Sequence, residues 1–158
     1  MIRTILFTLA MASAGFAQTS ADGSLTVNQE KVKLVQVYAF AATGFFDKQH
    51  DDTVVVLTDR AVTPEQARDV SALRRMAQDG KLAFVQETIN AGGQIINYTV
   101  GHKAFKAIPS GGSTEHVFEG KVAGQSISGK VYTKSPGEFF GTTFEYSAEF
   151  RTPVQPKK

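Results

Sequence analysis

The chain has 158 residues and contains no cysteine. Its 17 lysine and arginine residues nearly balance its 15 aspartate and glutamate residues, which leaves a formal net charge of +2. The lack of cysteine excludes thiol catalysis, cysteine metal ligands and disulfide bonds. The even charge balance, with a basic cluster at the Lys157 and Lys158 tail, does not favour a nucleic-acid partner.

Residues 1 to 17 have the pattern of a cleavable secretory signal peptide. Arg3 carries a positive charge, an apolar run follows from Thr4 to Ala14, and Gly15 and Ala17 are the small residues of a cleavage site. The run is shorter than the roughly 20 apolar residues of a spanning helix. We therefore expect a soluble mature product that is periplasmic or secreted, with residues 18 to 158 forming a single β-rich domain.

The first half of the domain alternates apolar and polar residues as strands do. Residues 23 to 28 form one such segment, and residues 32 to 40 form a second whose phase shifts at Val35, which predicts a bulge or burial on both faces. Residues 41 to 52 are expected to form a loop. The continuous apolar run of residues 53 to 58 predicts a strand covered on both faces at the centre of the sheet.

One amphipathic helix is expected over residues 64 to 79. Thr63, Pro64 and Gln66 form an N-terminal capping pattern, and Gly80 supplies a C-terminal stop. The apolar residues between them recur at helical spacing.

Period-two alternation returns after the helix. It predicts strands in the following segments: residues 82 to 90, 94 to 100, 114 to 123, 126 to 133 and 139 to 151. The short links between several of them favour antiparallel neighbours. The predicted fold class is α+β and mainly β: an antiparallel sheet or flattened barrel of about eight strands with the one helix packed on it.

Several segments resemble, in order and spacing, those of a family of small secreted bacterial proteins of uncharacterised function. They are Gly23 to Asn28, Val37 to Phe40, Gly44 to Lys48, Val55 to Arg60 and Gly137 to Gly141. The resemblance extends over nearly the whole mature chain and implies export and a single domain. It assigns no catalytic residue.

Histidine and carboxylate residues are candidates for metal binding and for catalysis. His50, Asp51 and Asp52 have the side chains that suit a zinc-like ion, but adjacent loop residues rarely point at one ion, so no metal site and no cofactor is predicted. His102 and His116, with Glu115 or Asp59 nearby, would suit acid-base chemistry if the fold brings them together. This is the hydrolase alternative, and no catalytic residue is assigned from the sequence.

Two aromatic pairs are the candidate binding residues: Phe45 with Phe46, and Phe139 with Phe140. Adjacent residues of an extended chain point to opposite sides, so one ring of each pair is expected at the surface unless both sides are covered. Exposed aromatic rings on loops are typical anchors for a partner.

These observations favour an exported, non-enzymatic binding or structural domain of the bacterial envelope, with another envelope or secreted protein as its partner. The two alternatives are the small extracytoplasmic hydrolase that uses His102 or His116, and a carrier that encloses a small apolar ligand.

Overall fold

The computed structural model describes residues 19 to 158. The predicted signal peptide, residues 1 to 17, lies outside the described residues. The described chain is mainly β, and its strands are β1 Ser20–Val27, β2 Glu30–Leu34, β3 Gln36–Thr43, β4 Asp51–Thr58, β5 Phe84–Ile89, β6 Ile95–Gly101, β7 Ser110–Gly111, β8 His116–Ala123, β9 Ser126–Thr133, β10 Gly137–Phe139 and β11 Thr142–Gln155. The helices are α1 Pro64–Arg68 and α2 Val70–Gln78.

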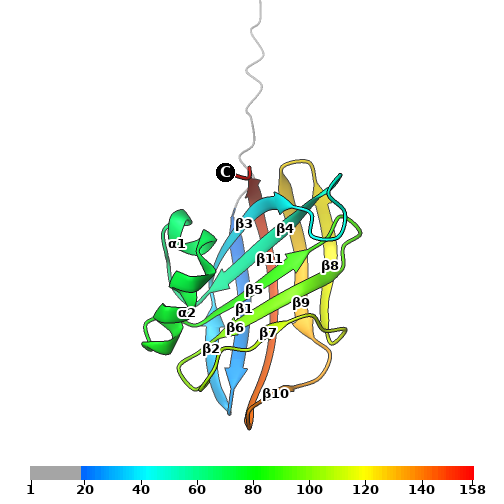
Figure 1. Ribbon diagram of the computed structural model, residues 1–158. Helices are drawn as coiled ribbons and strands as arrows, with labels where there is room; N and C mark the ends of the chain where they lie inside the picture. The colour runs from blue at the N-terminus through cyan, green and yellow to red at the C-terminus, as the bar shows by residue number, and fades with distance from the viewer. Residues whose placement is uncertain (1–18) are drawn as a thin grey trace, which may run out of the picture.

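The strands form one open, curled sheet with two halves (Figure 1). One half has the order β2-β1-β11-β9-β8, and the other has the order β3-β4-β5-β6-β7. The sheet curls so that β6 and β8 approach each other along a seam that no strand pairing closes in the part of the chain described here. The structure thus has the mainly β character predicted from the sequence.

The prediction of a purely antiparallel sheet is wrong. The last residues of β11, Val154 and Gln155, pair in parallel with Ala39 and Phe40 of β3, so the sheet is mixed. The parallel contact arises because β11 is long enough to run past the end of β1 and meet β3 there. A contact between two strands so distant in sequence leaves no local signal.

The described residues contain eleven strands, where about eight were predicted. The predicted strand 32 to 40 is divided at Val35, where the chain leaves β2 in one half of the sheet and enters β3 in the other. The predicted strand 139 to 151 is divided by the turn at Phe140 and Gly141, and β7 lies in a segment expected to be a connection. The shift of phase at Val35 therefore marks a passage between the two halves.

The helical segment consists of two short helices instead of one. Asp69 has an extended backbone (φ −97°, ψ 93°), and its carboxylate accepts hydrogen bonds from the backbone N–H groups of Ser71 and Ala72. Asp69 thus caps the N-terminus of α2 and ends α1. The capping box predicted at Thr63 and Gln66 is present at the start of α1.

Apolar clusters lie on the inner face of the curl and on the part of the outer face formed by β3, β4 and β5. The inner face of the curl encloses a cluster to which both halves contribute, including Leu25, Leu57, Val85, Ile127 and Phe144. The outer face of β3, β4 and β5 is covered by the helices, which pack on it with Ala67, Leu73 and Ala77 (Figure 1). β4 is consequently buried on both faces, as its continuous apolar run predicts. Within residues 19 to 158, no helix is long and apolar enough to cross a membrane.

Candidate functional site

The first aromatic pair, Phe45 and Phe46, lies on the loop between β3 and β4. Gly44 begins this loop at a point where any side chain would collide with the backbone carbonyls of Asp47 and His50. Glycine is therefore required for the tight path of the chain just before the two aromatic residues.

The loop is held by carboxylates. Asp52 of β4 is 5% exposed, and its Oδ2 accepts a hydrogen bond of 2.8 Å from the backbone N–H of Phe45. Asp47 accepts from the backbone N–H of Gln49 at 2.9 Å, and its other oxygen lies 2.6 Å from His50 Nδ1. The hydrogen bond from His50 lowers the pKa of Asp47. These contacts give the aromatic loop a defined shape.

Both rings of this loop point into solvent. Phe45 is 69% exposed and Phe46 is 76% exposed, and their ring centroids lie 4.9 Å apart in an edge-to-face arrangement. The Lys48 ammonium lies 5.7 Å from the centre of the Phe45 ring. Beside the rings, the loop and the β5–β6 turn enclose a small depression of about 150 Å³ that is lined in part by Phe46, Asn90 and Gly92. The loop thus presents an apolar projection next to a small hollow.

The second aromatic pair is divided between the core and the surface. Phe139 packs against the inner cluster, whereas Phe140 is 75% exposed. Phe140 and Gly141 form the two-residue turn between β10 and β11, with φ angles of 48° and 75°. Two successive positive φ values are typical of a type I′ turn, in which asparagine and glycine are preferred. The exposure of Phe140 therefore comes with a strained backbone.

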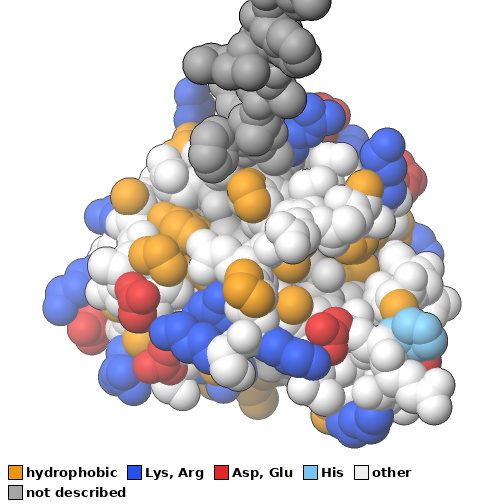
Figure 2. Space-filling view, turned by 90° about the horizontal axis from the view of Figure 1, so that it is seen from above, with side chains coloured by type: hydrophobic (Ala, Val, Ile, Leu, Met, Phe, Trp, Pro, Cys, Tyr) orange, Lys and Arg blue, Asp and Glu red, His pale blue; other side chains and the backbone are white. Residues whose placement is uncertain are grey.

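The two pairs do not form one surface. The β3–β4 loop lies at the end of the sheet toward which β3 and the C-terminal part of β11 run, and the β10–β11 turn lies at the opposite end (Figure 1). Viewed from above, the molecule shows hydrophobic side chains interspersed with charged ones (Figure 2). Any partner that contacts Phe45 and Phe46 therefore contacts a different region from one that contacts Phe140.

A buried polar cluster lies inside the curl. Glu87 of β5 points into the inner core between Val85 and Ile89 and is fully buried. The Tyr146 hydroxyl donates a hydrogen bond to Glu87 Oε1, and His116 Nδ1 lies 2.7 Å from the same hydroxyl. Glu87 Oε2 has no hydrogen-bond partner in the described structure.

Burial determines the protonation of this cluster. It raises the pKa of Glu87 well above its ordinary value and lowers the pKa of His116 to about 4, because the charged form of each loses its hydration. The ring of Tyr98 stacks on His116 at 3.8 Å between centroids, and burial also raises the pKa of Tyr98. Burial thus opposes the charged form of both Glu87 and His116, and the His116 ring is neutral at neutral pH.

His116 also borders the open seam of the sheet. A groove of about 480 Å³ runs between β6 and β8, and it is lined on one side by Ile95 and Ile96 and on the other by His116 and Phe118. Ser113 lies at the same groove. The groove joins two sheet edges and has an apolar lining.

The other histidine candidates have separate surroundings. His50, Asp51 and Asp52 contact different partners: His50 contacts Asp47, Asp51 contacts Lys157, and Asp52 binds the Phe45 amide. In residues 19 to 158 no group of three or more histidine, aspartate and glutamate side chains is placed to hold a metal ion.

His102 lies in a different depression from His116. Its Nε2 lies 3.7 Å from Glu30 Oε1, and the depression is also lined by Asp59 and Lys103. Burial lowers the pKa of His102. The two histidines thus have different carboxylate neighbours, and the carboxylate that His116 meets is Glu87 rather than Glu115 or Asp59.

Glu87 is the polar residue that the sequence reasoning missed. A signal was present, because Val85, Glu87 and Ile89 occupy alternate positions of one strand, and the two apolar residues place Glu87 on the buried face. Tyr146 shares a face with Phe144 and Phe150 for the same reason. The alternation within each strand identifies its buried face, and the fold shows which residues of the two strands meet there.

No protein-family model, no curated protein and no solved structure matches this chain. The resemblance to small secreted bacterial proteins therefore stays an expectation.

Proposed function

We propose that this chain is an exported, non-enzymatic binding domain that holds another protein of the bacterial envelope or medium through Phe45 and Phe46. The observation that carries the proposal is the exposure of two adjacent phenylalanine rings on a loop that a buried aspartate holds in place. Large apolar side chains grouped at the surface are unusual without a partner to cover them.

The energetics of such a contact favour binding. Burying one phenylalanine side chain contributes roughly 1.5–3 kcal/mol, so two rings supply a substantial part of a specific association. The Asp52 carboxylate already orders the start of the loop, which reduces the conformational entropy lost on binding. An ordered aromatic projection is a typical centre of a protein interface.

A protein partner fits this loop better than a lipid surface does. Asp47 is exposed beside the rings, and Asp51 is half exposed at the start of β4. Lys48 and the ion pair of Asp51 with Lys157 offset these two carboxylates, so the loop has no excess of positive charge to attract anionic lipids. A partner protein with an apolar pocket and a basic or hydrogen-bonding rim complements both the rings and the carboxylates.

The test replaces Phe45 and Phe46 together with serine and compares retention of envelope proteins by the variant and by the original chain. We expect the double variant to keep its thermal unfolding temperature and to lose the retained partner. Phe140→Ser is the matched control, because Phe140 is equally exposed at the opposite end. Equal retention by the Phe45→Ser/Phe46→Ser variant and the original chain would overturn the proposal.

Export is proposed from residues 1 to 17. Fractionation of cells, followed by N-terminal sequencing of the protein recovered, is the direct test. We expect a new N-terminus after Ala17 in the periplasm or the medium, and an intact Met1 in the cytosolic fraction would overturn this part of the proposal.

The hydrolase alternative has one observation in its favour: the Glu87–Tyr146–His116 cluster reaches the groove at which Ser113 also lies. Ser113 Oγ accepts a hydrogen bond from the Glu115 backbone N–H, and no hydrogen bond joins it to His116 in the described part of the chain. If the groove is a hydrolytic site, Ser113→Ala and His116→Gln abolish ester hydrolysis. The same low activity in both variants and in the original chain would rule it out.

The carrier alternative is not favoured by the interior of the curl. The space between the two halves is occupied by the side chains of the inner cluster, among them Leu25, Val131 and Phe150. A carrier requires a cavity of several hundred cubic ångströms that encloses its ligand. In the described structure the depressions of that size open at the surface.

A further inference from the structure

β8 is an edge strand whose outer side has no pairing partner. It pairs along all eight of its residues with β9, and no other strand of residues 19 to 158 pairs with it (Figure 1). From Glu119 onward its residues are exposed. A free edge of this length presents backbone N–H and C=O groups to another extended chain.

The hairpin geometry shows which residues present these groups. β8 and β9 are joined by the two-residue turn Gly124–Gln125, with Ala123 opposite Ser126. In such a hairpin the pair next to the turn is hydrogen-bonded, and bonded and non-bonded pairs alternate along the strands. The backbone groups of Phe118, Gly120 and Val122 therefore point away from β9, toward the free edge.

The charges of β8 match those of a second, antiparallel β8. If a two-fold axis passes beside Gly120, then Gly120 faces its own copy, and Glu119 of each chain faces Lys121 of the other. An axis at Glu119 or at Lys121 would instead place two like charges directly opposite each other, which is destabilising. Among the registers centred on residues 119 to 121, the charge pattern thus selects the one centred on Gly120.

The apolar residues agree with the same register. Phe118 of one chain would lie opposite Val122 of the other, on the inward face of the strand. Val122 is 45% exposed in the single chain, and this contact would cover it. The end of the second β8 would enter the groove between Ile96 and Phe118, which has a volume of about 480 Å³.

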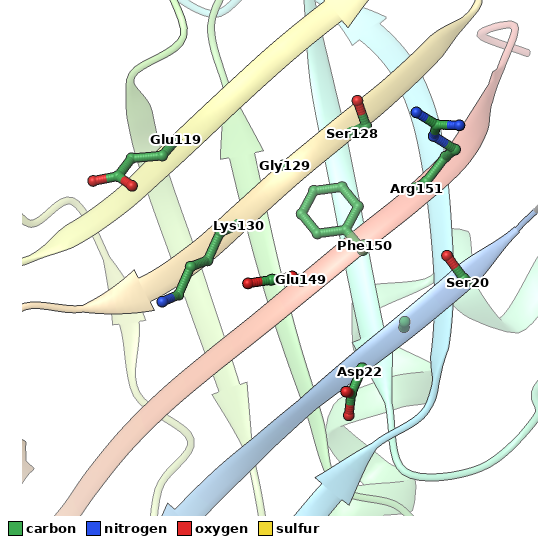
Figure 3. A pocket seen from close by; sticks show the side chains of 10 residues that line it. Ser20, Asp22, Glu119, Ser128, Gly129, Lys130, Glu149, Phe150 and Arg151 are labelled. Carbon is green, nitrogen blue, oxygen red and sulfur yellow. The ribbon is translucent and has the colours of Figure 1, made fainter.

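Both charged side chains are available for the contact. Glu119 lies on the outer face of the sheet at the border of the depression shown in Figure 3, where one of its oxygens accepts a hydrogen bond of 2.6 Å from Tyr132. Its other oxygen is free to accept. Lys121 forms no ion pair with any residue between 19 and 158.

We propose that two copies of this chain associate through their β8 edges, which pair antiparallel about Gly120 and join the two sheets into one continuous sheet. The pairing uses the backbone of β8 and no residue of the Phe45–Phe46 loop, so it goes beyond the binding function proposed above. A symmetric contact of one strand with its own copy closes after two chains and does not propagate into a fibre.

The experiment exchanges the charges and measures mass by light scattering and sedimentation. Glu119→Lys alone and Lys121→Glu alone each place like charges opposite one another, so each purified variant is expected to remain at the monomer mass. When the two variants are mixed, every substituted side chain faces one of opposite sign, and the expected mass is that of a heterodimer. The original chain is expected at twice the monomer mass.

Glu138→Lys is the matched control, because it makes the same change of charge on β10, away from the β8 edge. It is expected to leave the dimer intact. A monomer mass for the original chain at about 1 mM, a concentration at which weak complexes form, would overturn the proposal. So would dimers in either single-charge variant, or a failure of the mixture to associate while both variants remain folded.

Amide hydrogen exchange gives a readout that does not depend on substitution. As the concentration of the original chain rises, exchange is expected to slow at the amides of Phe118, Gly120 and Val122. The alternate amides of β8, which already bond to β9, are expected to change much less. If exchange at the amides of Phe118, Gly120 and Val122 does not depend on concentration, the proposed contact is contradicted. It is also contradicted if the chain stays monomeric and an extended peptide from another protein binds this edge.

Discussion

Glu87 on β5 and His116 at the start of β8 meet inside the curl, with 3.5 Å between Glu87 Oε1 and His116 Nδ1. They come from opposite halves of the sheet and are linked through the Tyr146 hydroxyl. Burial works against both charges: it raises the pKa of Glu87 well above its ordinary value and lowers the pKa of His116 to about 4.

The buried Glu87 predicts a loss of stability as the pH rises. Its folded-state pKa is raised above the ordinary value of 4.5, so the folded state holds the proton more tightly than the unfolded state does. The free energy of unfolding therefore falls as the pH rises from 4.5 through the folded-state pKa, by up to about 1.4 kcal/mol per pH unit within that window.

Glu87→Gln removes this dependence, because glutamine keeps the shape and an acceptor oxygen without an acidic proton. We expect the variant to be more stable than the original chain at alkaline pH, as measured by urea unfolding from about pH 5 to about pH 9. Glu149→Gln, on the exposed outer face, serves as the control. Parallel curves for the Glu87→Gln variant and the original chain would contradict the prediction.

The lowered pKa of His116 predicts the opposite effect at acidic pH: the free energy of unfolding falls as the pH falls. Its folded-state pKa is lowered from 6.5 to about 4, so the stability it contributes is present above pH 6.5 and is lost as the pH falls to about 4. Nuclear magnetic resonance should show the His116 ring neutral until the pH approaches 4. A His116→Gln variant identifies the signal, and a ring that becomes charged near pH 6.5 would show that the interior does not exclude the charged form.

The buried cluster also shows how far the sequence predicts this molecule. Alternation of apolar and polar residues correctly places most strands, because the residues of a single strand determine which of its faces is buried. The same alternation puts Glu87 and Tyr146 on buried faces. It does not reveal that they face each other, since that depends on how the two halves curl together.

Two of the errors in the predicted fold have physical causes of different kinds. Asp69 lies on the polar side of the predicted helix, but its short carboxylate caps a new helix instead of continuing the first. The spacing of apolar residues does not distinguish these two outcomes. The parallel pairing of β11 with β3 depends on the length of β11 and the curvature of the sheet. Neither quantity is set by the residues that make the contact.

The turn at Phe140 predicts a stabilising substitution. Phe140 has a φ angle of 48° and precedes Gly141 at 75°, a conformation that asparagine adopts more readily than phenylalanine. We expect Phe140→Asn to raise the free energy of unfolding by roughly 1 kcal/mol, the lower end of the cost of a strained residue. Phe46→Asn is the control, since Phe46 is equally exposed and has no positive φ. An equal change in both variants would mean that the turn is not the cause.

The hydrogen bond from the Phe45 backbone N–H to the Asp52 carboxylate predicts that the order of the aromatic loop depends on Asp52. Asp52→Ala leaves the backbone N–H of Phe45 without its acceptor, and the loss of such a buried partner costs about 1–3 kcal/mol. We expect faster exchange of the Phe45 amide and weaker partner binding, because a loosened loop has to be ordered again on contact. Asp52→Asn retains a carbonyl oxygen at the same place and should restore most of both properties. The Asp52→Ala variant could show faster exchange of the Phe45 amide and still bind a partner as tightly as the original chain. That result would show that the rings bind without the Asp52 hydrogen bond and that the order of the loop does not contribute to recognition.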